Sequence, residues 1–152
     1  MYDPAGTESM PGRARRSASY FGVTTVRDKP TISSFRDLIV WQRAMELAEA
    51  CHALVSTLPR GRMPALRDQI ERCCISVPAN IAEGNGRQRL GDYLRYLSIA
   101  AGSLAELRTH VELVARLHLA DEASVARPRA LADEVSRMLS ALIKALEARR
   151  QT

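Results

Sequence analysis

Aromatic residues, cysteines and long apolar runs are all scarce in this chain of 152 residues. Aromatic residues make up only 5%, and no segment approaches the 18 or so consecutive apolar residues that a membrane-spanning helix requires. The first residues also lack an apolar run long enough for the core of a signal peptide. These absences exclude an integral membrane protein, and we expect a cytoplasmic one.

The few cysteines and histidines do not form a recognisable metal-binding pattern. No two of the three cysteines have Cys-x-x-Cys spacing, and no short ligand spacing joins the histidines to the cysteines or to one another. Because the cysteines are odd in number and lie in helical patterns, we expect reduced, buried thiols. The sequence therefore predicts neither a metal nor a cofactor. The residues in question are Cys51, Cys73 and Cys74, and His52, His110 and His118.

Positive charge is in modest excess, with 22 Lys and Arg residues against 17 Asp and Glu residues, a net charge of +5. Residues 1–34 contain five basic and three acidic residues, together with three prolines and many serines and threonines. This composition predicts a flexible basic N-terminal arm, which either touches nucleic acid or is a solvated extension. The remaining domain, residues 35–152, has a net charge of only +3.

Four segments show apolar residues spaced three and four apart, and no segment alternates with a period of two. Turn residues such as Pro59, Gly61 and Gly86 separate the four patterns. This arrangement predicts an all-α, antiparallel up-and-down four-helix bundle. The expected helices begin near Phe35, after the capping-box-like Ser34 and Asp37, at Pro64, at Leu90 and near Pro128. In the same order, they end before Pro59, before Gly84, at Leu117 and near Arg150.

Several positions within these helices carry more detailed predictions. Trp41 is expected to be the large core anchor, and two parallel apolar stripes on the first helix predict contacts with a second subunit. Pro78 predicts a kink, because a proline disfavours helical angles at the preceding Val77. Gly84 and Gly86 are expected to end the second helix, with glycine supplying a positive φ. Gly102 predicts the close approach of another helix.

Three runs in the chain resemble a known bacterial family. The run from Phe35 to Ala44 reads FRDLIVWQRA, the run from Gln69 to Arg87 reads QIERCCISVPANIAEGNGR, and the run from Tyr93 to Leu107 reads YLRYLSIAAGSLAEL. In order and spacing, these runs resemble the four-helix-bundle family of 23S rRNA intervening-sequence (S23-like) proteins. The resemblance extends over most of residues 35–146 and leaves residues 1–34 outside it.

This resemblance implies a homo-oligomer, a ring of five bundles, without an assigned catalytic activity. A related bundle is the accessory variability protein of diversity-generating retroelements, in which a basic pentamer binds nucleic acid and a reverse transcriptase. The family name refers to genes located within rRNA insertions and does not establish that these proteins bind rRNA.

A cluster of polar residues falls within the second of these runs. Asn80 and Glu83 are three residues apart on one helix face, and Arg87 lies beyond the glycine turn, where it can fold back toward Glu83. Together with Trp41 and Gly84, these residues are interpreted as a structural or assembly motif, with contact to a ligand or nucleic acid as the alternative. The sequence offers no second acid, base or metal for catalysis, so we expect a protein that is not an enzyme. Tyr93 and Tyr96 are interpreted as packing residues.

The leading functional hypothesis is a non-enzymatic ring that binds nucleic acid, or an enzyme acting on nucleic acid, through an arginine-rich surface. The alternative is a structural or adaptor ring that recruits another protein without binding nucleic acid. The candidate phosphate-binding residues are expected near one end of the second and third helices. They are Arg60, Arg62, Arg67, Arg87, Arg89 and Arg95.

Overall fold

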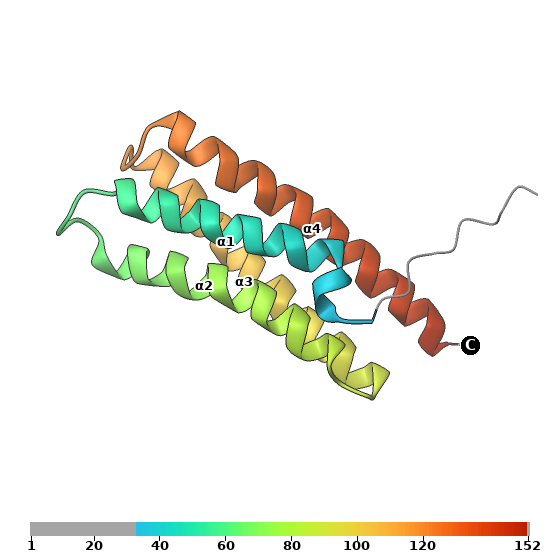
Figure 1. The fold of residues 1–152 in the computed structure, drawn as a ribbon. Coiled ribbons are helices and arrows are strands. Elements are labelled where there is room, and N and C mark those ends of the chain that lie inside the picture. The colour runs from blue at the N-terminus through green and yellow to red at the C-terminus, as the bar shows by residue number, and fades with distance from the viewer. Residues whose placement is uncertain (1–32, 152) are drawn as a thin grey trace, which may run out of the picture. The chain divides into compact units, whose positions relative to one another are not determined.

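The structure, a computed structural model, describes residues 33–151, which form four α-helices after one short 3₁₀ helix (Figure 1). No strand occurs within this range, so the prediction of an all-helical fold with four helices is confirmed. The predicted basic arm falls outside the described residues except for Ser33 and Ser34. The elements are η1 (Phe35–Asp37), α1 (Ile39–Thr57), α2 (Pro64–Asn85), α3 (Leu90–Arg116) and α4 (Glu122–Arg150).

Each helix packs against the next one in the chain, and α4 packs back against α1 (Figure 1). Short connections between successive helices make the neighbours antiparallel. The α1–α2 and α3–α4 turns therefore lie at one end of the bundle, which we call the α1–α2 end. The α2–α3 turn and the C-terminus lie at the opposite end, which we call the α2–α3 end. The 22 residues of α2 separate the two ends by about 33 Å, at 1.5 Å per residue.

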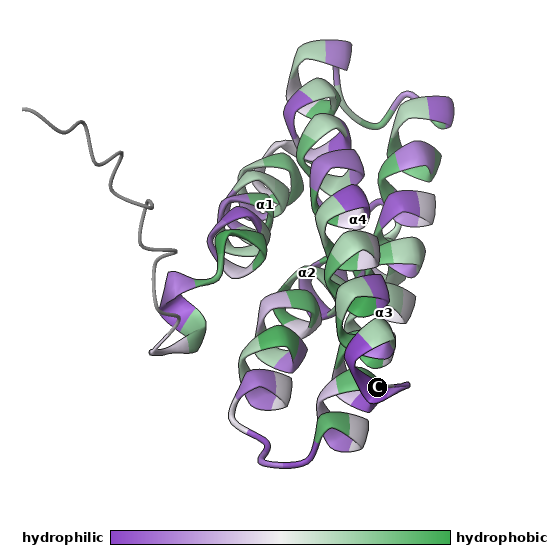
Figure 2. Cartoon of the chain, turned by 90° about the vertical axis from the view of Figure 1, so that its right-hand side faces the viewer, coloured by the Kyte–Doolittle hydropathy of each residue, from purple (hydrophilic) through white to green (hydrophobic). Residues whose placement is uncertain are grey.

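All four helices contribute apolar side chains to one continuous core, and each helix contains both polar and apolar residues (Figure 2). No polar or charged residue within the described range is buried. None of the described helices is long and apolar enough to cross a membrane. The largest fully buried side chains are Leu47, Leu54, Ile70, Ile81, Leu97, Leu107 and Leu139.

The predicted capping box before the first helix is confirmed, but it caps a single 3₁₀ turn. The Ser34 hydroxyl accepts a hydrogen bond from the backbone N–H of Arg36, and the Asp37 carboxylate accepts one from the backbone N–H of Ser34 at 2.9 Å. Hydrogen bonds from Ser33 and Ser34 lower the pKa of Asp37. Leu38 then adopts an extended conformation, so α1 begins at Ile39 rather than near Phe35.

Helix α2 continues without interruption through Pro78, so the prediction that Val77 leaves helical angles is wrong. Both residues are buried among apolar neighbours. Packing of the helix on both sides of the proline holds Val77 in the helical conformation against its local preference.

The fourth helix begins six residues earlier than predicted, at Glu122 instead of near Pro128. Its N-cap is Asp121, whose carboxylate accepts a hydrogen bond from the backbone N–H of Ser124 at 2.7 Å. Pro128 is buried within the helix. The prediction gave weight to the proline, which suits a first helical turn, and overlooked the capping aspartate.

Trp41 is only partly buried, so the prediction that it is the large core anchor is wrong. Its ring packs edge-on against Phe35, with 5.1 Å between the ring centroids. The pair covers one side of the core near the start of α1, while aliphatic side chains fill the centre of the bundle. Trp41 therefore helps to seal the α2–α3 end of the bundle rather than to fill its interior.

Candidate functional site

The predicted pairing of Glu83 with Arg87 is confirmed, and Tyr96 joins it. Glu83 lies in the last turns of α2, and the Arg87 guanidinium folds back from the α2–α3 turn to form an ion pair with its carboxylate. The same guanidinium donates to the Tyr96 hydroxyl at 2.9 Å and lies over the Tyr96 ring, 4.9 Å from its centroid. Three side chains from α2, the turn and α3 therefore fix the geometry of this turn.

The electrostatics of this group are those of a surface ion pair. Hydrogen bonds from Tyr96 and Arg87 lower the pKa of Glu83, and the Glu83 carboxylate raises the pKa of Arg87. Both charged side chains are nearly half exposed, at 48% for Glu83 and 45% for Arg87. Solvent screens such a pair, so it contributes little to stability, roughly 0–1 kcal/mol. Both groups are charged near neutral pH, and neither has the intermediate pKa that acid–base catalysis requires.

Gly84 is needed for close packing rather than for an unusual backbone angle. It is buried within α2 and lacks the predicted positive φ, since within residues 33–151 only Gly61 among the glycines has one. A Cβ atom at this position would lie 2.9 Å from the Tyr93 ring and 2.9 Å from Cβ of Tyr96. Gly84 therefore allows α3 to approach α2 closely, one residue after Glu83 in the chain.

Asn80 lies apart from the Glu83–Arg87 pair, so the prediction that the three residues form one cluster is wrong in this respect. Its amide donates to the Ser76 carbonyl at 2.8 Å and to the Ser76 hydroxyl at 3.0 Å. The Ser76 hydroxyl forms a 2.8 Å hydrogen bond with the Ser103 hydroxyl of α3. Asn80 is therefore part of a polar link that sets the register between α2 and α3.

The six candidate phosphate-binding arginines do not lie near one end of the bundle, and that prediction is wrong. Arg60, Arg62 and Arg67 lie in the α1–α2 turn and the first turn of α2, whereas Arg87, Arg89 and Arg95 lie in the α2–α3 turn and the first turns of α3. Successive turns of an antiparallel bundle lie at opposite ends, so the two sets are separated by the length of α2 (Figure 1).

Charge is nevertheless distributed unequally between the two ends. The midpoints of the four helices separate the bundle into two halves. The half toward the α2–α3 end, residues 33–48, 75–103 and 137–150, contains nine basic and five acidic residues, a net charge of +4. The other half, residues 49–74 and 104–136, contains eight basic and nine acidic residues, a net charge of −1. The positive charge of the domain therefore belongs to the α2–α3 end.

Each end of the bundle has both paired and unpaired arginines. Near the α1–α2 end, an open groove of about 710 Å³ between α3 and α4 contains three arginines, and each forms an ion pair with an acidic side chain. At the α2–α3 end, Arg89, Arg95 and the last-turn Arg149 and Arg150 form no ion pair with any described residue. Near the α1–α2 end, Arg60, Arg62, Arg72 and Arg127 likewise form no ion pair with a described residue. The groove arginines are Arg108, Arg116 and Arg129.

Two groups of interacting side chains were missed by the sequence analysis. Tyr96 was interpreted as a packing residue, and only the short turn of this bundle brings its hydroxyl to Arg87. Cys73, Glu106 and His110 lie together between α2 and α3, with their potential ligand atoms within 4.8 Å of one another. Glu106 and His110 are four residues apart on one helix face, which was an available signal, but Cys73 lies on another helix.

Comparison with known proteins supports both the fold and the family resemblance. The family model described as 23S rRNA-intervening sequence protein matches residues 36–141. A crystal structure from Bacteroides thetaiotaomicron VPI-5482, described as a protein with unknown function from the S23 ribosomal protein family, is similar with a TM-score of 0.65 and 24% sequence identity. That similarity covers 70% of this chain and 99% of the other. No curated protein matches the chain.

Proposed function

Because the chain belongs to the 23S rRNA-intervening sequence protein family, whose model matches most of the bundle, we propose that it is a non-enzymatic homo-oligomer that binds nucleic acid through its α2–α3 end. The unequal distribution of charge carries this proposal. The half of the bundle at the α2–α3 end has a net charge of +4, and the other half has a net charge of −1. A phosphate backbone is therefore attracted to the α2–α3 end.

The chemistry of that end suits a phosphate backbone better than a small ligand. Eight of the nine basic residues in that half are arginines, whose guanidinium groups bind phosphate oxygens in a planar, two-pronged geometry. Arg149 and Arg150 lie in the last turn of α4, where their charge also offsets the partial negative charge of the helix terminus. The net charge of one domain is small, so several copies acting together are needed for appreciable affinity.

Nucleic-acid binding by this end is testable with matched pairs of arginines. We expect single-stranded or duplex RNA or DNA to bind the full chain at low salt in fluorescence anisotropy, with affinity that falls as salt rises. The double variant Arg89→Ala, Arg95→Ala is expected to weaken binding. It is also expected to reduce the slope of log affinity against log salt concentration by about 1 for each lost phosphate contact. Neither side chain forms an ion pair with a described residue, so the fold is expected to persist.

The matched control is the double variant Arg60→Ala, Arg62→Ala, which removes the same charge from the opposite end of the bundle. We expect this variant to retain most of the binding. Equal losses from the two double variants would contradict an interface at the α2–α3 end. A complete absence of binding at low salt would rule out the nucleic-acid proposal and leave the adaptor ring, which recruits a protein, as the remaining function.

Exposed apolar side chains support the proposed self-association. Ile75 on α2 is 64% exposed and Ile99 on α3 is 42% exposed, although both residues belong to helices with well-packed inner faces. A Cβ atom placed on the nearby Gly102 would meet nothing within 4 Å in the single chain. A second copy packed over α2 and α3 would remove both isoleucines from water, which is favourable by roughly 25 cal/mol per Å² of apolar area.

The mass of the assembly in solution tests this part of the proposal. For a ring of five, light scattering coupled to size exclusion is expected to give about 84 kDa at micromolar concentration, five times the 16.8 kDa of one chain. The variant Ile75→Glu is expected to lower that mass, because a carboxylate would be buried without a partner at the contact. A monomeric mass for the unmodified chain would refute the ring.

A further inference from the structure

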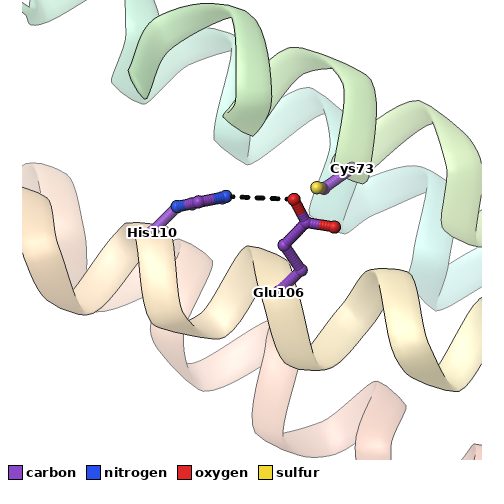
Figure 3. A group of neighbouring side chains, drawn as sticks. All are labelled: Cys73, Glu106 and His110. Atoms are coloured by element: carbon purple, nitrogen blue, oxygen red, sulfur yellow. Dashed lines mark hydrogen bonds and ion pairs between the residues drawn. The ribbon is translucent and has the colours of Figure 1, made fainter. Parts of the chain in front are cut away.

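Three side chains of metal-binding type converge between α2 and α3. Cys73 comes from α2, and Glu106 and His110 come from α3 (Figure 3). Nε2 of His110 lies 3.4 Å from a carboxylate oxygen of Glu106, and the Cys73 sulfur points toward the same carboxylate. One ligand atom from each of the three lies within 4.8 Å of the other two.

The register of the two helices explains why these residues meet. The hydrogen bond between Ser76 and Ser103 marks a point where α2 and α3 lie side by side. Cys73 lies three residues before Ser76, and Glu106 lies three residues after Ser103, so in an antiparallel pair both positions are about one turn further along in the same direction. His110 follows Glu106 by four residues on the same helix face.

The potential ligand atoms of this group make few hydrogen bonds with the rest of the protein. Cys73 is buried at 4% exposure, and the His110 side chain is 18% exposed. Nδ1 of His110 is buried and has no hydrogen-bond partner within the described residues, so the one hydrogen bond of this ring there is to Glu106. The Glu106 side chain is 53% exposed, which gives the group access to solvent.

We propose that Cys73, Glu106 and His110 bind a single divalent transition-metal ion of the Zn²⁺ class. A thiolate, an imidazole nitrogen and a carboxylate oxygen are the three ligand types that Zn²⁺ prefers, and a sulfur ligand disfavours Mg²⁺ and Ca²⁺. With three protein ligands, a tetrahedral ion has a fourth position open to water at the exposed edge of the site. Ligand atoms around such an ion are roughly 3–4 Å apart, so small rotations of the side chains bring them into range.

The positive charge of Arg72, next to Cys73, opposes the binding of a cation. Arg72 is exposed, and solvent and salt screen its repulsion of a metal ion. The carboxylate and the thiolate together supply two negative charges that offset the charge of a divalent ion. An ion bound here would connect α2 to α3 by direct bonds and would stabilise their packing.

Titration of the tag-free, reduced full chain with Zn²⁺, and with Co²⁺ as a spectroscopic probe, tests this site. We expect one ion per chain, a thiolate-to-cobalt charge-transfer band, and a rise in Tm of about 5–10 °C when Zn²⁺ is a hundredfold above its Kd. All cysteines and histidines of the chain lie within the described residues, so their contributions can be separated by substitution.

Three ligand variants and two controls make the result specific. Cys73→Ala, His110→Ala and Glu106→Gln are each expected to weaken Zn²⁺ binding by at least about 100-fold. Cys74→Ala removes an adjacent thiol and His52→Ala removes an exposed histidine, and both are expected to leave binding unchanged. Glu106→Gln alters an exposed side chain, so its fold is expected to persist even if the two buried variants unfold. The site is refuted if the folded chain binds no ion, or if Glu106→Gln and the controls bind equally well.

Discussion

The substitution Leu107→Ala is expected to lower the free energy of unfolding by about 3–5 kcal/mol, the upper part of the range for a buried leucine. Leu107 is fully buried on α3, which packs against both α2 and α4. Removing its isobutyl group would leave a cavity between three helices, and close packing on all sides limits how far the surrounding side chains can relax. Urea denaturation followed by circular dichroism measures the change.

Leu113→Ala on the same helix is the matched control for this experiment. Its side chain is 37% exposed, so the same truncation creates no enclosed cavity and is expected to cost less than about 1 kcal/mol. If the two variants were equally destabilised, the loss would arise from the helix itself rather than from the core. The interpretation of Leu107 as a central core residue would then be incorrect.

Much of the fold could be predicted from the sequence, because helical periodicity depends on neighbours within the same segment. The apolar spacing predicted four helices, and the capping pair of Ser34 and Asp37 forms as predicted, although it caps a 3₁₀ turn rather than α1. The errors arose where tertiary packing, rather than the local sequence, determines the conformation or burial of a residue. Val77 keeps helical angles before Pro78, and Trp41 lies at the edge of a core filled by aliphatic side chains. Neither result follows from the local preferences of a single residue.

The candidate site was predictable only where its residues are close in sequence. Glu83 and Arg87 are four residues apart, and their pairing was foreseen. The division of the six arginines between two ends follows from bundle topology, which the sequence analysis had predicted but had not applied to these residues. Cys73 and His110 are on different helices, and their proximity depends on the register set by Ser76 and Ser103.

Gly84 provides the second large effect on stability. The substitution Gly84→Ala is expected to destabilise the protein by about 1–2 kcal/mol, and Gly84→Leu by about 3 kcal/mol or more. The added Cβ would lie 2.9 Å from Cβ of Tyr96, an atom that is attached to the backbone and cannot rotate away. Helix α3 itself would have to move, and the contact of Tyr96 with Arg87 would move with it. Chemical denaturation measures the loss.

Gly102 provides the control, because alanine has the opposite expected effect there. It lies within α3, is exposed, and a Cβ added to it would meet nothing within 4 Å. Alanine is a better helix former than glycine by about 1 kcal/mol, so Gly102→Ala is expected to stabilise the single bundle by up to that amount. Changes in stability of opposite sign for Gly84→Ala and Gly102→Ala would show that contact with α3, rather than helix propensity, accounts for the glycine at position 84. Destabilisation of the assembled protein by Gly102→Ala would instead indicate that the second copy proposed to pack over α2 and α3 covers this glycine.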